Sequence, residues 1–185
     1  RDLVEQTRRL SYALKKLGIG QESFIGLLLN NSTEFVISML AAADLGATIV
    51  PMSNSLGQRD LLTTIKLTGI RFIIGWHMTL KKIFDLSEDN FVIPRDHCIT
   101  VGGEANGLHY FNDFLEMAPE EYELNDSEVD EEADFILTMT SGSTSAPKPI
   151  VFTQRTKIVR SLAAQTLYGI SENDITLTPT PLYHS

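Results

Sequence analysis

Short apolar runs alternate with longer segments of helical spacing along most of this chain, and this alternation constrains its fold more than any other feature. The apolar runs, each typical of a buried strand, are residues 24–29, 48–50, 72–74 and 135–139. The helical segments are residues 2–17, a segment from Asn31 to about Gly46, and residues 61–69, 77–86 and 154–168. Because successive strands are separated by helices, they pair in parallel through crossover connections. The sequence therefore predicts an α/β fold with a doubly wound, mostly parallel sheet and flanking helices.

Several local features refine this prediction. Asn31 and Glu34 have the spacing of an N-cap and the third helical residue, so we expect the second helix to begin at Asn31. Residues 98–101 and 175–178 are further expected strands, and 102–107 form an expected turn. In the last helix the residues expected to face the core are Ile158, Leu162 and Leu167.

The negative charge is confined to one segment. The chain has a formal net charge of -9, and residues 116–134 hold ten acidic residues and no lysine or arginine, so the rest has 15 basic and 14 acidic residues. Such a run is typical of a solvated connector, although a metal cluster is the alternative. The absence of a basic stripe argues against nucleic acid as a partner. No apolar run approaches the roughly 20 residues of a membrane span, so we expect none in this segment.

A single cysteine, Cys98, bears on compartment and chemistry. It excludes an internal disulfide and favours a reducing compartment, so we expect an intracellular protein, cytoplasmic or organellar. The sequence begins at Arg1 without methionine, so targeting segments are not expected within it. Because the neighbours of Cys98 are apolar, a buried core residue is favoured over a nucleophile.

A polar loop follows the strand at 135–139. It comprises Thr140, Ser141, Gly142, Ser143 and Thr144, with Lys148 four residues later. Ligands of α/β sheets bind beyond the carboxyl ends of the strands, where this loop is expected. Its hydroxyl and backbone N–H groups can donate to phosphate oxygens while the lysine adds a positive charge. A Walker loop is excluded because prolines flank the lysine, and a plain turn remains the alternative.

The order T-S-G-S-T-x-x-P-K closely resembles the phosphate loop of the adenylate-forming, or AMP-binding, superfamily, which includes acyl-CoA synthetases, 4-coumarate-CoA ligases, luciferases and peptide-synthetase adenylation domains. Four other segments resemble family segments in the same order. They are LLNNSTEF at 28–35, AADLGATIVP at 42–51, TGIRFIIG at 68–75 and PLYHS at 181–185. The resemblance thus extends over nearly the whole chain.

This resemblance implies that the parent protein uses ATP to convert a carboxylic acid into an acyl adenylate and then an acyl-CoA, with Mg²⁺ and coenzyme A. A fatty acid is the favoured substrate and an aryl acid the second. The residues implied for nucleotide binding are Thr140, Ser141, Gly142, Ser143, Thr144 and Lys148, with Thr144 at the magnesium ion. Lys148 and His184 are the implied catalytic residues, with His184 beside the acyl pocket.

The resemblance also implies that residues 1–185 are part of an N-terminal AMP-binding domain, with an acidic connector at 116–134 and with the C-terminal lid domain absent. We expect this fragment alone to be inactive. Ser145 and Pro149 stand where the family has glycine. These departures motivate one alternative, a non-catalytic relative that binds nucleotide or acyl ligand. A peptide-synthetase adenylation domain is the other alternative.

Overall fold

The computed structural model describes residues 2–85, 93–104, 107–119, 129–140, 148–177 and 179–184. The strands are β1 (Phe24–Leu28), β2 (Thr48–Pro51), β3 (Phe72–Trp76), β4 (Cys98–Val101), β5 (His109–Tyr110), β6 (Asp134–Thr140) and β7 (Lys148–Thr153). The α-helices are α1 (Asp2–Lys16), α2 (Thr33–Asp44), α3 (Gln58–Thr68), α4 (His77–Asp85), α5 (Phe111–Glu116) and α6 (Gln154–Tyr168). Two short 3₁₀ helices are η1 (Arg95–His97) and η2 (Leu182–His184).

The described strands form one sheet in the order β5-β4-β3-β1-β2-β6-β7. All neighbouring pairs from β5 to β6 are parallel, and β7 alone is antiparallel, paired with β6. The chain builds β2 on one side of β1 and then crosses to the other side for β3. The predicted doubly wound, mostly parallel α/β sheet is confirmed.

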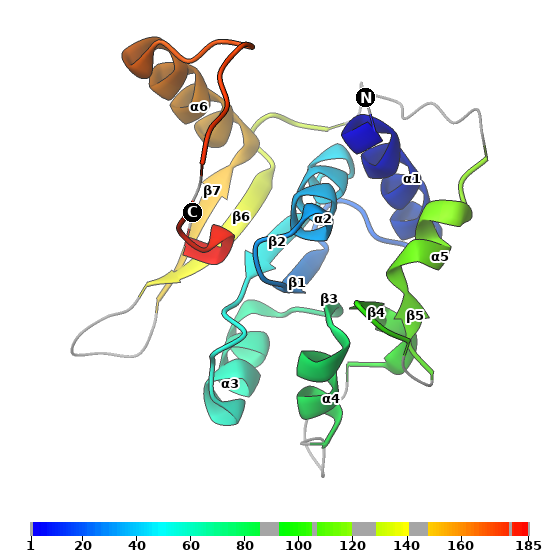
Figure 1. Cartoon of the computed structure of the whole chain (residues 1–185). Coiled ribbons are helices and arrows are strands. Elements are labelled where there is room, and N and C mark those ends of the chain that lie inside the picture. The colour runs from blue at the N-terminus through cyan, green and yellow to red at the C-terminus, as the bar shows by residue number, and fades with distance from the viewer. Residues whose placement is uncertain are drawn as a thin grey trace.

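Helices cover both faces of the sheet (Figure 1). One apolar cluster joins α1, α2 and α5 to the sheet, and a second joins α3 and α4 to it. Neighbouring strand residues divide between the clusters, as Ile74 and Ile73 of β3 do. This alternation follows from the two-residue period of a strand. It explains why the strand sequences read as unbroken apolar runs.

The start of α2 corrects the expectation for Asn31. Ser32 is the N-cap: its extended backbone (φ -156°, ψ 165°) directs the side-chain hydroxyl to accept from the Phe35 N–H at 3.2 Å. Asn31 therefore lies one residue before the cap. Serine and asparagine are both strong N-cap residues, and the spacing alone selected the wrong one.

Two expectations near the C-terminal end were also wrong. Ile158, Leu162 and Leu167 do not face a core, because their exposed fractions are 55%, 56% and 76%. Of the strand expected at 175–178, residues 175–177 form no strand, with Ile175 fully exposed, and Thr178 lies outside the described residues. Figure 1 shows α6 standing beside the long β6–β7 hairpin, away from the α1–α2 layer. Its apolar pattern is helical, but in the described chain no layer covers it.

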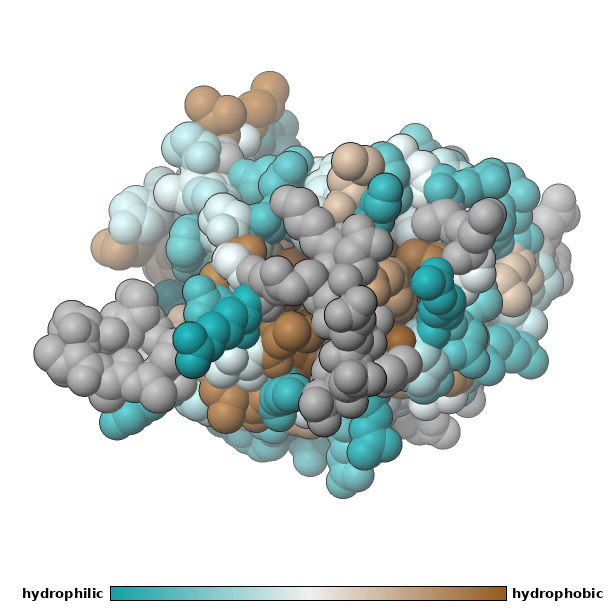
Figure 2. All heavy atoms as spheres, turned by 90° about the horizontal axis from the view of Figure 1, so that it is seen from below, coloured by the Kyte–Doolittle hydropathy of each residue, from teal (hydrophilic) through white to brown (hydrophobic). Residues whose placement is uncertain are grey.

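Figure 2 shows the molecule from the side of α3 and α4. Polar residues dominate this face, with apolar residues between them, and Leu67 and Met78 are among the exposed apolar residues of α3 and α4. Further apolar residues stand out at the distant upper left, the side on which Figure 1 places α6. None of the helices within the described residues is long and apolar enough to span a bilayer.

Candidate functional site

The carboxyl ends of the parallel strands meet at one edge of the sheet. β1 ends at Leu28, β2 at Pro51, β3 at Trp76 and β6 at Thr140. The chain changes direction around β1 at this edge, because β2 and β3 lie on its opposite sides. Ligands of open α/β sheets bind at such a switch point. The carboxyl edge is therefore the candidate functional site.

The polar loop after β6 leaves from this edge. Thr140, at the end of β6, pairs with Lys148, the first residue of antiparallel β7. The hairpin thus brings together the first and last residues of the predicted phosphate loop. Ser141, Gly142, Ser143 and Thr144 lie outside the described residues, so their roles stay predictions. Lys148 is exposed.

Pro149 lies inside β7, opposite Met139. In the sheet that the described strands form, β7 is the last strand, and an edge strand tolerates a residue without an N–H donor. A proline also favours an extended conformation in the residue before it. Pro149 is therefore compatible with Lys148 as a strand residue directly after the loop.

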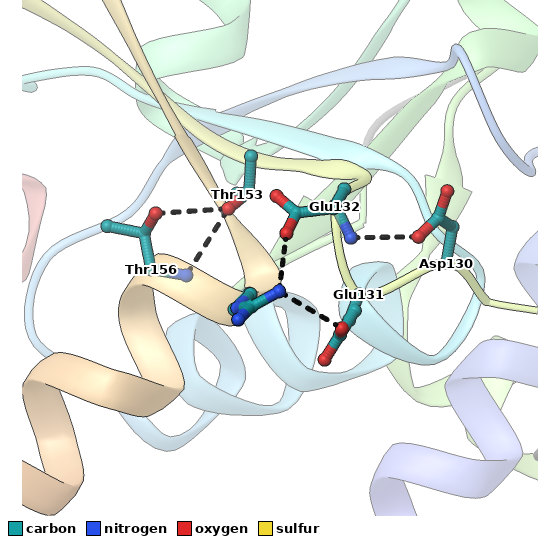
Figure 3. A network of polar contacts seen from close by, with 6 residues as sticks. Asp130, Glu131, Glu132, Thr153 and Thr156 are labelled. Carbon is teal, nitrogen blue, oxygen red and sulfur yellow. Dashed lines mark hydrogen bonds and ion pairs between the residues drawn. The ribbon is translucent and has the colours of Figure 1, made fainter.

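Besides the pairing of β6 with β2, the hairpin contacts the rest of the molecule through the start of α6. The Gln154 side-chain Nε2 donates to the Ala43 carbonyl of α2 at 2.8 Å. Arg155 contacts Glu131 and Glu132, at 3.3 and 3.0 Å, so the end of the acidic segment meets α6 (Figure 3). Thr153 caps α6 by accepting from the Thr156 N–H (Figure 3). These contacts join the start of α6 to α2 and to the residues that precede β6.

His184 reaches the same edge from the other end of the chain. It is the last residue of η2, which packs against β2, and Leu182 packs against the larger apolar cluster. The Asn31 side chain binds this segment: its Nδ2 donates to the Thr180 carbonyl at 2.9 Å, and its Oδ1 accepts from the Leu182 N–H at 2.8 Å. The structure thus places the predicted catalytic histidine at the carboxyl edge.

A shallow cleft lies at the ends of β1, β2 and β3. Its lining residues are Asn30, Asn54, Trp76, His77, Met78 and Thr79. The amide groups of Asn30 and Asn54 lie 2.9 Å apart and join the ends of β1 and β2. Sequence reasoning missed Asn30, Asn31 and Asn54 as residues of this edge. The available signal was a tandem pair of asparagines directly after a buried strand.

The other reactive side chains do not form a site among the described residues. Burial raises the pKa of the Cys98 thiol to about 12, with the nearby Asp96 adding to the increase, so the thiol stays protonated at neutral pH. The cysteine is 1% exposed, which confirms it as a core residue. The ring of His97 stacks on Phe72. Within the described residues, no group of three or more histidine, cysteine, aspartate or glutamate side chains is placed to hold a metal.

The family follows from a comparison with known proteins. The profile of the AMP-binding enzyme family matches residues 1–185. The chain belongs to this family. The recognition made from the phosphate loop and four further segments is therefore confirmed.

The curated relatives that this chain matches are longer than the chain itself. It is 29% identical to 4-coumarate:CoA ligase 1 of Petunia hybrida, covering 99% of the chain and 33% of the relative. It is also 29% identical to the chalcone synthase cfoA of Aspergillus candidus, covering 99% of the chain and 7% of that protein. The chain thus spans a third or less of the length of these two relatives.

Solved structures agree on the fold. A long-chain-fatty-acid-CoA ligase from Archaeoglobus fulgidus superposes with a TM-score of 0.85 at 20% identity, covering 99% of this chain and 35% of the other. A luciferase from Phrixothrix hirtus gives 0.80 at 16% identity, covering 98% and 45%. At these identities the likeness shows the fold alone. Both neighbours therefore support the α/β fold of the described chain.

Proposed function

We propose that the full-length protein is an AMP-forming acid-thiol ligase that activates a carboxylic acid with ATP and transfers the acyl group to coenzyme A. The observation that carries this proposal is the β6–β7 hairpin at the carboxyl edge. The first and last residues of the phosphate-loop motif, Thr140 and Lys148, pair in this hairpin. Family membership over the whole chain supports it.

The chemistry requires neutralisation of negative charge. A carboxylate must attack the α-phosphorus of ATP while the β and γ phosphates leave, so donors and cations around those phosphates stabilise the transition state. We assign the phosphates to Thr140, Ser141, Gly142, Ser143, Thr144 and Lys148. Thr144 would hold Mg²⁺, and the bound ion would supply further positive charge to the phosphates. We assign His184, whose short helix packs against β2, to positioning the acid's carboxylate.

The acid is either a fatty acid or an aryl acid. A fatty acid is the default expectation, and the named fatty-acid ligase resembles this chain in fold. The 4-coumarate ligase, whose name denotes an aryl acid, is the more similar in sequence. One substrate panel containing both classes separates the two candidates by their kcat/KM values.

Release of pyrophosphate from the full-length protein tests the proposal. With ATP and Mg²⁺, we expect release that depends on the added acid. Lys148→Ala should lower kcat/KM about 100-fold, since one preorganised contact to transition-state charge is worth roughly 10²–10³ in rate. Arg59→Ala, an exposed cation on α3, is the matched control and should change kcat/KM less than about twofold.

Two outcomes contradict parts of this proposal. ATP binding without acid-dependent pyrophosphate release would instead support a non-catalytic nucleotide-binding relative, the reading that Pro149 beside Lys148 motivates. Unchanged kinetics in Lys148→Ala would remove this lysine from the site while leaving the enzyme class intact.

A further inference from the structure

Asn31 joins two parts of the chain that are far apart in sequence. Its side-chain amide uses both polar atoms on the main chain of the 180–182 segment, donating to the Thr180 carbonyl at 2.9 Å and accepting from the Leu182 N–H at 2.8 Å. A single hydrogen bond would leave the segment free to pivot. Two bonds from one planar amide fix both its position and its rotation.

The amide is available for this contact because Asn31 has no role in capping α2. Ser32 supplies the cap, with its hydroxyl accepting from the Phe35 N–H. Asn31 stands between the end of β1 and this cap, so two neighbouring elements hold its backbone. We call Asn31 with its hydrogen bonds to Thr180 and Leu182 the Asn31 clamp; it lies at the carboxyl edge, between β1 and α2.

The clamp acts close to His184. Leu182, whose N–H it binds, packs against the larger apolar cluster, and the His184 N–H donates to the Pro181 carbonyl at 3.0 Å. This turn leaves little backbone freedom between the clamp and the histidine. The Tyr183 ring adds a contact, with its centroid 4.6 Å from that of the His184 ring.

We propose that Asn31 is a positioning residue for acid activation, acting through His184. By holding residues 180–182 at the carboxyl edge, its amide orients the imidazole toward the acid's carboxylate. This inference rests on the proposed function for its catalytic consequence, whereas the clamp itself is a property of the fold.

Two nearly isosteric variants separate the hydrogen bonds from the shape of the side chain. Asn31→Leu removes both bonds. Asn31→Asp keeps the acceptor for the Leu182 N–H but loses the donor and places a negative charge beside the Thr180 carbonyl. Asn112→Leu on α5 is the matched control, because Asn112 is also exposed and its amide makes a local bond to the Tyr110 hydroxyl at 3.3 Å. Figure 1 places α5 across the molecule from η2.

Hydrogen exchange at the Leu182 amide of the full-length protein tests the clamp without any need for activity. We expect exchange about tenfold faster in Asn31→Leu than in the natural protein, a smaller increase in Asn31→Asp, and no change in Asn112→Leu. This factor corresponds to the net value of one or two ordinary hydrogen bonds. Equal exchange in Asn31→Leu and the natural protein would overturn the clamp.

Steady-state kinetics of pyrophosphate release test the positioning role. In Asn31→Leu we expect kcat/KM for the acid to fall about tenfold while the KM for ATP changes less than twofold. A merely structural role of Asn31 would impair the steady-state parameters for the acid and for ATP together, and that result would overturn the proposal. A natural protein without acid-dependent release would overturn the proposed function and the catalytic role of Asn31, while exchange would still decide the clamp.

Discussion

At Gly102 the main chain approaches the Trp76 ring closely, beside the cleft at the carboxyl edge. Its φ is +79°, and a Cβ atom built there would lie 2.5 Å from the Cζ3 atom of Trp76, a residue lining the cleft. A side chain therefore meets both backbone strain, about 1–2 kcal/mol, and overpacking, about 1–3 kcal/mol. Glycine at this position lets the Trp76 ring pack directly against the main chain.

We expect Gly102→Ala to lower the free energy of unfolding by about 2–5 kcal/mol, measured by urea denaturation. Gly18→Ala is the matched control, because Gly18 has a φ of +82° and no heavy atom within 4 Å of the built Cβ. That variant should show the strain alone, about 1–2 kcal/mol. Equal losses in the two variants would mean that the Trp76 ring moves aside without cost.

Single residues also show where sequence reasoning succeeds and where it stops. Cys98 was predictable because its apolar neighbours form part of a strand with both faces covered. The roles of Asn31 and Ser32 were not predictable, since either residue can cap a helix and the choice depends on a contact with residues 180–182. Local patterns do not contain contacts that span the whole sequence.

Among the elements, predictions held wherever a pattern was long enough. The strands β1, β2, β3, β4 and β6 and the helices α1 to α4 and α6 were expected within a few residues of their bounds. β5 has only residues 109–110, too few to show a two-residue period, and α5 follows it directly. The antiparallel β7 was not expected, because Pro149 weakens the strand pattern of this segment. The proline is tolerated since, among the described strands, β7 pairs with β6 alone.

The attachment of the β6–β7 hairpin provides a prediction about α6. Gln154 donates to a partly buried carbonyl of α2, whereas the Arg155 contacts with Glu131 and Glu132 are exposed, with side chains 57–67% accessible. Gln154→Ala should therefore lower the free energy of unfolding by about 1 kcal/mol. Arg155→Ala should change it by less than about 0.5 kcal/mol, because exposed ion pairs contribute little.

Urea denaturation followed by circular dichroism checks this difference. Raising the salt concentration should remove the remaining effect of Arg155→Ala and leave that of Gln154→Ala unchanged. A larger loss for Arg155→Ala would show that the ion pairs with Glu131 and Glu132 stabilise the start of α6 more than its bond to α2 does.

For the molecule as a whole, the position of the candidate site followed from strand polarity. Once residues 135–139 were expected to be a parallel strand, Thr140 and the loop after it had to lie at the carboxyl edge, and the structure places Thr140 and Lys148 there. Periodicity and composition did not show that residues 180–184 return to this edge, and only the family resemblance of PLYHS implied it. In the structure, the Asn31 hydrogen bonds and the packing of Leu182 against the larger apolar cluster hold this segment there.

The two ends of the molecule differ in burial, which gives a prediction for its stability. Leu14 of α1 is fully buried in the larger apolar cluster, whereas Leu162 of α6 is 56% exposed. In the 185-residue chain we expect Leu14→Ala to cost about 2–5 kcal/mol of unfolding free energy, because it removes buried methyl groups and leaves a cavity. Leu162→Ala should cost less than about 0.5 kcal/mol. Urea denaturation of both variants measures the difference, and a loss at Leu162 as large as at Leu14 would show that the α6 face is covered in solution.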